Sequence, residues 1–133
     1  MPKLCEAARA VVAYIVRESS DGILMLSIPR RNTGEHAAPG GQVERDAFGE
    51  WESWEDALAR EVYEEIGCRV IRAWRVHCGC VNGFHVEIYR VEVEGEPYAR
   101  EAGSRIEWVP PVQIANGFAG ELHSVGVRAA GLI

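Results

Sequence analysis

The stretch AREVYEEIG, residues 59–67, concentrates acidic side chains that could bind a metal ion. It contains Glu61, Glu64 and Glu65, which fall on one side of a helix that turns by about 100° per residue. Like charges three or four positions apart destabilise a helix by about 0.2–0.5 kcal/mol per pair, and no lysine offsets them here. A solvated helix face is the ordinary explanation of such a cluster, whereas a stability cost of this kind is expected at a functional site.

The type of these side chains predicts a class of metal. Mg²⁺ and Mn²⁺ are hard cations that prefer oxygen ligands, and the absence of His and Cys from residues 54–66 argues against zinc on this helix. Upstream, Gly40 and Gly41 would let the backbone approach a ligand closely. A lone Gly-Gly pair is usually a turn, but a pair that leads into an acidic helix is more specific evidence.

The helix itself is well marked. Ser53 is a favourable N-cap, and Gly67 lies where a left-handed C-cap belongs. Apolar residues at every fourth position would pack on a sheet: Leu58, Val62 and Ile66. The sequence therefore predicts a helix over residues 54–66.

Segments rich in apolar and β-branched residues predict the strands 7–16, 23–28, 68–80, 84–95 and 105–109. Residues 19–22 and Asn82-Gly83 are hairpin turns, and residues 30–41 and 94–104 are loops. Pro110-Pro111 breaks the chain before a C-terminal helix over 118–133, which two glycines weaken. The order β-β-α-β-β-β-α predicts an α+β sandwich with helices covering a mixed sheet.

Composition narrows the function classes. A chain of 133 residues with 47% apolar residues is expected to form one domain, residues 1–133. The net charge of −6 argues against nucleic acid or a membrane surface as partner, since both need a basic face. No signal peptide or membrane span is recognisable, so the cytoplasm is the expected location.

The chain has four cysteines and no C-x-x-C pair. Cys5, Cys68, Cys78 and Cys80 are predicted to be buried free thiols, and a zinc site is the second interpretation. His77 and His85 lie in strand patterns and are expected to be structural.

Arg60-Glu61-Val62-Tyr63-Glu64-Glu65-Ile66-Gly67-Cys68 resembles the core of the Nudix box, Arg-Glu-aliphatic-x-Glu-Glu-x-Gly-aliphatic, with Cys68 in the last aliphatic position. Glu52 lies eight residues before Arg60, where the family has its first Glu, and Pro39-Gly40-Gly41 resembles the glycine pair that opens the box. The strand order and small size are similar to MutT-like members. The resemblance implies a Nudix-type α/β/α sandwich with a mixed sheet between helices.

One departure concerns the loop before the helix. Ten residues separate Gly41 from Glu52, several more than in the family pattern, so residues 45–51 are an insertion. Glu50 competes with Glu52 for the first-Glu role. Glu52 is preferred because the helix fixes its spacing to Arg60. Trp51 and Trp54 flank it and are expected to cover the core.

The resemblance implies a hydrolase that cleaves a diphosphate linkage in a nucleoside diphosphate joined to a group X, with Mg²⁺ or Mn²⁺ as cofactor. A nucleoside triphosphate, including a damaged one, is the favoured substrate. ADP-ribose, dinucleoside polyphosphates and nucleotide sugars are alternatives, and a non-catalytic nucleotide sensor is the rival class. A homodimer is expected only by analogy with the fold.

The resemblance also assigns roles. The metal ligands would be Glu61, Glu64, Glu65 and a carbonyl of Gly40 or Gly41. The catalytic group would be Glu61, Glu64, Arg60, Glu52 and Glu101, with the identity of the general base left open. Arg60 would pair with Glu52 and orient the acids. Arg30 and Arg31 are candidates for substrate binding; like Glu101, they could equally be solvated loop residues.

Overall fold

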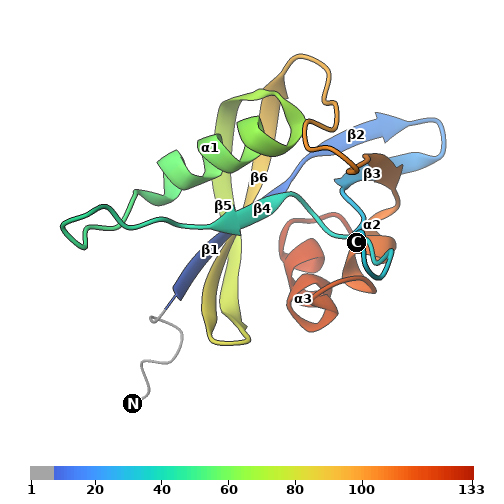
Figure 1. Ribbon diagram of the computed structural model, residues 1–133. Coiled ribbons are helices and arrows are strands. Elements are labelled where there is room, and N and C mark those ends of the chain that lie inside the picture. Colours follow the sequence, from blue (N-terminus) through green and yellow to red (C-terminus); the bar gives the residue numbers. More distant parts are fainter. Residues whose placement is uncertain (1–7) are drawn as a thin grey trace.

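The computed structural model describes residues 8–133 as two β-sheets and three helices. The first sheet has the strand order β4 (Gly40–Gln42), β1 (Ala8–Tyr14), β6 (Phe84–Glu94), β5 (Arg69–Val81). In it β1 and β6 are parallel and the outer pairs are antiparallel. The second sheet has the antiparallel order β2 (Val16–Ser19), β3 (Gly22–Ser27), β7 (Glu107–Val109). Figure 1 labels the strands of the first sheet and β2 and β3 of the second.

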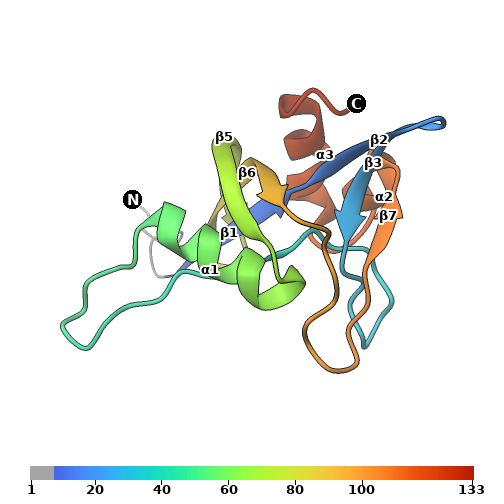
Figure 2. The same ribbon diagram turned by 90° about the horizontal axis from the view of Figure 1, so that it is seen from above.

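Helices cover both faces of the first sheet. α1 (Trp54–Ile66) lies on one face, and α2 (Pro111–Ala115) and α3 (Gly120–Ala129) lie on the other (Figure 2). Alternate residues of β1 separate the two cores: Val11 packs in the cluster of α1, whereas Tyr14 packs in the cluster of α3. The predicted α+β sandwich with a mixed sheet is thus confirmed.

The predicted helix 54–66 has the observed bounds. The Ser53 hydroxyl accepts a hydrogen bond from the Asp56 N–H at 3.0 Å, and Gly67 is left-handed at φ 69° with its N–H on the Tyr63 carbonyl. Local sequence signals therefore define both ends of α1.

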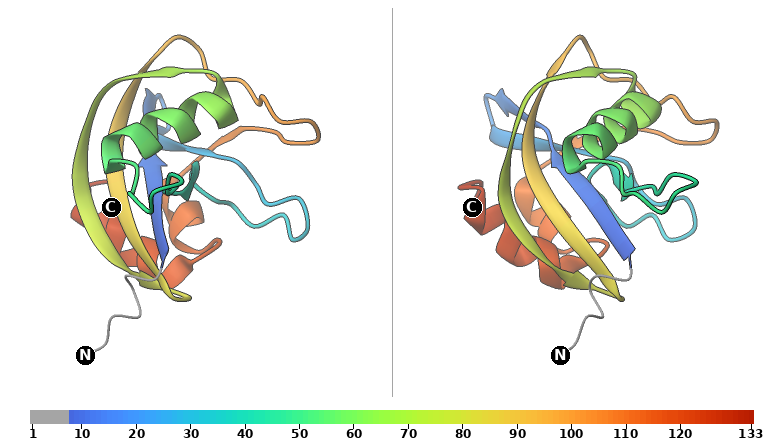
Figure 3. Two further views of the ribbon diagram at one scale, coloured as in Figure 1. Left: turned by 60° about the vertical axis from the view of Figure 1, so that its left-hand side comes forward. Right: turned by 90° about the vertical axis from the view of Figure 1, so that its left-hand side faces the viewer.

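The long hairpin is also as predicted. β5 and β6 are curved strands that run past α1 (Figure 3), and they meet at Asn82 and Gly83, with φ of 50° and 83°. Positive φ at both central residues is what a two-residue hairpin turn of type I′ requires.

Some predicted bounds differ from the observed elements. The strand 7–16 is two strands, because the chain passes at Ile15 from the first sheet to the second. The loop 30–41 contains the start of β4, whose glycines gave no strand signal. Pro110-Pro111 follows the end of β7, as expected, but the short helix α2 was not predicted. It begins at Pro111, since Pro at the first helical position lacks only an N–H that needs no partner there.

The C-terminal helix is shorter than predicted. It runs over Gly120–Ala129, after Ala119 in a left-handed conformation and before Gly131, which is left-handed too. Within residues 8–133, no helix is long and apolar enough to cross a membrane.

The cysteine prediction holds in part. Cys68 is a buried free thiol, as expected, whereas Cys78 is a free thiol on the surface and Cys80 is disulfide-bonded. Burial fails for Cys78 because its strand lies at the edge of the sheet. Cys5 lies outside the described residues.

Candidate functional site

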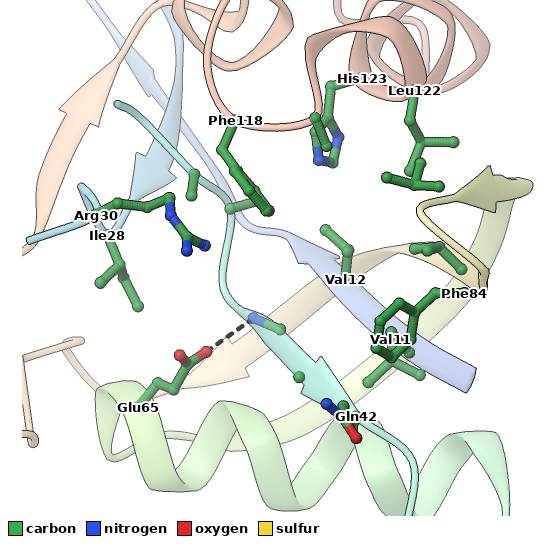
Figure 4. A pocket seen from close by; sticks show the side chains of 18 of the residues that line it. Val11, Val12, Ile28, Arg30, Gln42, Glu65, Phe84, Phe118, Leu122 and His123 are labelled. Atoms are coloured by element: carbon green, nitrogen blue, oxygen red, sulfur yellow. Dashed lines mark hydrogen bonds between the residues drawn. The ribbon is translucent and has the colours of Figure 1, made fainter. Parts of the chain in front are cut away.

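β4 fits between β1 and α1 because it consists largely of glycine. A Cβ on Gly40 would overlap the carbonyl oxygen of Val11 in β1, and a Cβ on Gly41 would overlap the carboxylate of Glu61 in α1. The Gly40 N–H donates a hydrogen bond of 2.8 Å to the Glu65 carboxylate, drawn as the dashed line in Figure 4. The absence of side chains at the two glycines therefore lets β4 pack closely against β1 on one side and α1 on the other.

Arg60 holds the acidic residues around it. Its guanidinium donates two hydrogen bonds to Glu52, at 2.9 and 2.8 Å, in a bidentate pair. It also donates to the Gln42 carbonyl at 3.0 Å and to Glu61 at 2.8 Å. Glu64 lies 3.4 Å away and its side chain is 53% exposed. One cation thus links the loop before α1, the end of β4 and the acidic face of the helix.

The carboxylates differ in their electrostatic environment. Burial, together with the charges of Glu61, Glu101 and Glu64, raises the pKa of Glu65 to about 8, although the hydrogen bond from the Gly40 N–H lowers it. Burial also raises the pKa of Glu61, although Arg60 counteracts it. The hydrogen bond from Arg60 lowers the pKa of Glu52. Negative charge at the end of α1 is therefore poorly compensated by the protein itself.

The insertion before α1 is an ordered hairpin, not an extended loop. Glu52 N–H bonds the Glu44 carbonyl at 2.8 Å, and Arg45 and Trp51 form a β-bridge. At the tip, the Asp46 carboxylate accepts the N–H groups of Phe48 and Glu50 at 2.8 and 3.0 Å. The inserted hairpin extends away from the sheets and beyond the start of α1 (Figure 1).

That hairpin also fixes the first glutamate. The Glu44 N–H donates to Glu52 Oε1 at 3.1 Å, the oxygen that also accepts from Arg60 Nη2. Glu50, the competing candidate, contributes its backbone to the hairpin instead. Trp51 is partly buried, and the guanidinium groups of Arg9 and Arg45 lie 4.6 and 4.1 Å from its ring centroid.

A cavity of about 660 Å³ opens beside Glu65 and β4. Figure 4 shows Glu65 at one end and Leu122 and His123 at the other. Its walls are mostly apolar, with Val12 and Phe84 from the sheet, and the Arg30 guanidinium lies 3.9 Å from the ring centroid of Phe118.

The cavity gathers several predicted site residues from distant segments. Those that line it are Gly40, Gly41, Glu65, Arg30, Arg31 and Glu101. Arg31 donates to the Ala102 carbonyl at 2.7 Å, so it braces the loop that carries Glu101. Arg60, Glu52, Glu61 and Glu64 are not among the lining residues.

Sequence reasoning missed the far wall of the cavity. His123 is buried, at 4% exposure, and its Nδ1 lies 2.5 Å from the hydroxyl of Tyr14. Burial lowers the pKa of His123 to about 4, so the ring is neutral. Gly126 leaves the space that the Tyr14 hydroxyl occupies, and a glycine in mid-helix was the one signal of this contact.

The donor set at the end of α1 suits a hard divalent cation. All its ligand atoms are oxygens, and the missing Cβ of Gly41 leaves the room in which the Glu61 carboxylate sits. In the structure Arg60 and Gly40 hold Glu61 and Glu65 by hydrogen bonds. The residues present therefore fit a magnesium-type ion.

Comparison with known proteins now decides the family. The family model of the NUDIX domain matches residues 7–125, most of the chain. The chain belongs to the Nudix family. Because the chain belongs to this family and keeps the acidic helix, the protein is a Nudix pyrophosphohydrolase.

Solved structures of other Nudix proteins share the fold. A MutT structure from a study of Aliivibrio salmonicida and Vibrio cholerae is 25% identical, with a TM-score of 0.74 over 95% of this chain and 98% of that one. The MutT Nudix hydrolase of Burkholderia pseudomallei is also 25% identical, with a TM-score of 0.69 over 90% and 97%. The Nudix domain of Shewanella oneidensis NrtR, solved with ADP ribose, is 16% identical with a TM-score of 0.69 over 92% and 85%, which shows the fold alone. No curated protein matches the sequence.

Proposed function

We propose that this Nudix hydrolase cleaves a diphosphate linkage in a nucleoside triphosphate, a damaged nucleotide included, with Mg²⁺ as cofactor and Mn²⁺ as a substitute. The observation that carries the proposal is the acidic end of a nucleoside-sized cavity. Burial and neighbouring charges disfavour the ionised form of Glu65 there. A triphosphate would add further negative charge, so only a bridging cation makes that contact favourable.

Glu61, Glu64 and Glu65, with a carbonyl of Gly40 or Gly41, would hold the ion. When bound, it would neutralise phosphate oxygens and lower the pKa of the attacking water. Arg60 would keep Glu61 aligned, because the bidentate contact with Glu52 holds the Arg60 guanidinium in place. Glu101, on the opposite loop, is the additional acid that reaches the same cavity.

The rest of the cavity suits the nucleoside. Phe118 offers a ring for stacking, with Arg30 against it at 3.9 Å; stacking of this kind binds any base. The Tyr14 hydroxyl is fully buried, and its one partner among the described residues is His123 Nδ1, so Tyr14 donates and His123 carries its proton on Nε2. His123 would then present a donor to an acceptor atom on the base.

Other assignments follow from the same proposal. The partner is a small-molecule nucleotide rather than nucleic acid or a membrane, and the cytoplasm is the proposed location. A homodimer stays a prediction by analogy. ADP-ribose, dinucleoside polyphosphates and nucleotide sugars belong in the first substrate panel, because each contains the same diphosphate linkage.

The test is hydrolysis of this panel by the pure protein with and without Mg²⁺ or Mn²⁺, followed as phosphate release. Metal-dependent cleavage is expected, and Glu61→Gln should lower kcat at least about 100-fold with an unchanged circular dichroism spectrum. Glu55→Gln, in the first turn of the same helix, is the matched control and should keep full activity. Tight nucleotide binding without turnover in the folded wild-type protein would instead favour the nucleotide sensor.

A further inference from the structure

Three metal-ligating side chains meet on the hairpin of β5 and β6, away from the cavity. Cys78, His85 and Glu87 each offer a ligand atom, and these atoms all lie within 4.8 Å of one another. Cys78 is the register partner of Glu87, and His85 lies two residues before Glu87 on β6. No other group of three His, Cys, Asp or Glu residues meets this criterion within residues 8–133.

This cluster and the cavity lie on opposite faces of the sheet. Phe84 and Val86 of β6 line the cavity, and the alternation of a strand sends His85 and Glu87 to the other face. There the ring of His85 lies 5.7 Å from the ring of Trp54, at the start of α1. A ligand at the cluster would thus contact neither the nucleotide nor the acidic end of α1.

Glu87 is a buried carboxylate, at 6% exposure, on the sheet face that packs against α1. It accepts hydrogen bonds from the Tyr89 hydroxyl and from Arg75, both at 3.2 Å, and its Oε2 lies 3.3 Å from His85 Nε2. Tyr89 occupies Oε1, so Oε2 is the oxygen that faces the imidazole. Burying a carboxylate is costly, and a ligand role gives a reason to keep it.

The ligand types differ from those of α1. A thiolate, an imidazole nitrogen and a carboxylate oxygen form a mixed set that suits Zn²⁺, with three protein ligands and water as the fourth. Cys78 is an exposed free thiol that can rotate toward the other two ligands. The side chain of Arg75 is 57% exposed and can leave Oε2 for solvent. Cys80 is disulfide-bonded and is not counted as a ligand.

We propose that Cys78, His85 and Glu87 form a second metal site that binds Zn²⁺ in tetrahedral geometry. Binding releases the thiol proton of Cys78 to solvent and leaves the net charge of the ligands and ion at zero. The ion would tie the two strands of the hairpin to each other and, through His85 and Trp54, to the start of α1. This proposal does not depend on the substrate or on hydrolysis.

Co²⁺ is the probe, because a Co²⁺–thiolate bond gives a charge-transfer absorption that oxygen ligands cannot produce. The metal-free full chain is titrated with Co²⁺ in the presence of excess Mg²⁺, which occupies oxygen sites. One equivalent should produce the thiolate band with tetrahedral d–d bands, and Zn²⁺ should abolish both.

Variants assign the ligands. Cys78→Ser should remove the thiolate band, and His85→Gln and Glu87→Gln should each weaken Zn²⁺ binding at least about tenfold, since even changes outside the ligand set cost about 10–100-fold. The double variant Glu61→Gln/Glu65→Gln is the matched control and should keep the band. Circular dichroism shows whether each variant is folded, and Cys78→Ser should hydrolyse substrate as the wild type does. Absence of the band in the wild type, or its persistence in Cys78→Ser, would overturn the proposal.

Discussion

The two faces of the central sheet are built in different ways. On one face α1 has a serine N-cap, a left-handed glycine C-cap and an apolar stripe, all within fifteen residues of sequence. On the other, α3 has no side-chain cap, and it follows a left-handed alanine. Its position depends on long-range contacts such as Tyr14 with His123. Local signals thus define the helix that carries charge, whereas tertiary packing defines the helix that closes the cavity.

The electrostatics of the two faces differ in the same way. At the α1 face, burial and like charges raise the pKa of Glu65, and a single arginine holds the surrounding acids. At the α3 face the buried polar pair Tyr14–His123 is neutral, because burial raises the pKa of Tyr14 and lowers that of His123. The first face carries negative charge that the protein itself compensates poorly. The second carries a buried, neutral, hydrogen-bonded pair.

The largest expected effects come from adding one methyl group at each of the two glycines. Gly41→Ala places a Cβ on the flexible carboxylate end of Glu61, which can move, so the fold should survive. The displaced carboxylate should lower kcat about 100-fold, the cost of misplacing a catalytic group by about 1 Å. Steady-state kinetics with the preferred substrate of the panel measure this effect.

Gly40→Ala is the matched comparison, because its Cβ would meet the rigid backbone of Val11. It should cost about 1–3 kcal/mol of folding free energy, as overpacking does, measured by urea denaturation. Gly40→Ala would thus damage the site by destabilising the fold, whereas Gly41→Ala would damage it by displacing the side chain of Glu61. Equal loss of stability in both variants would contradict this distinction.

The next effect is a pH dependence that belongs to the α3 face. The pKa of His123 is about 4 in the folded protein and about 6.5 in an unfolded chain, so the unfolded state binds the proton more tightly. The stability that neutral His123 provides is fully present above about pH 6.5 and is lost as the pH falls to about 4. The loss should reach about 3 kcal/mol, at about 1.4 kcal/mol per pKa unit.

Thermal denaturation of the wild type and His123→Gln between these pH values tests the assignment. The glutamine can still accept a hydrogen bond from Tyr14 but does not titrate, so the variant should lose most of this acid dependence. His77→Gln replaces a partly buried histidine of β5 and should keep it. An unchanged slope in His123→Gln would assign the acid sensitivity to other groups.

Sequence reasoning predicted the parts of the site that depend on neighbours in the chain. The bounds of α1, the turn at Asn82-Gly83 and the acidic face of the helix all follow from residues within a few positions of one another. It did not find β4, because Gly40 and Gly41 carry no strand propensity and are placed by contacts with β1 and α1. It also predicted that residues 45–51 only lengthen a loop. In the structure they form a hairpin, in which the Asp46 carboxylate binds two backbone N–H groups.

The far wall of the cavity was beyond sequence reasoning for a related reason. Phe118 and His123 lie outside any regular apolar period, and their partners Arg30 and Tyr14 are 88 and 109 residues away in the chain. No local pattern encodes such a pair. Arg30 and Arg31 were both predicted to bind substrate, but they make different contacts in the structure. Arg30 lies on the ring of Phe118, and Arg31 binds the Ala102 carbonyl.

The smallest expected effect separates binding from chemistry across the two faces. If the α3 face holds the nucleoside and the α1 face carries the reaction, then Phe118→Leu should raise KM and leave kcat unchanged. Leucine keeps an apolar contact but removes the stacking surface, which contributes at least about 1 kcal/mol per base, so a rise in KM of about fivefold is expected. Phe48→Leu is the matched control, because Phe48 is 90% exposed at the tip of the inserted hairpin and should leave both constants unchanged. A fall in kcat with unchanged KM for Phe118→Leu would place the reacting phosphates nearer to α3 than to α1, and the division of labour between the two faces would be wrong.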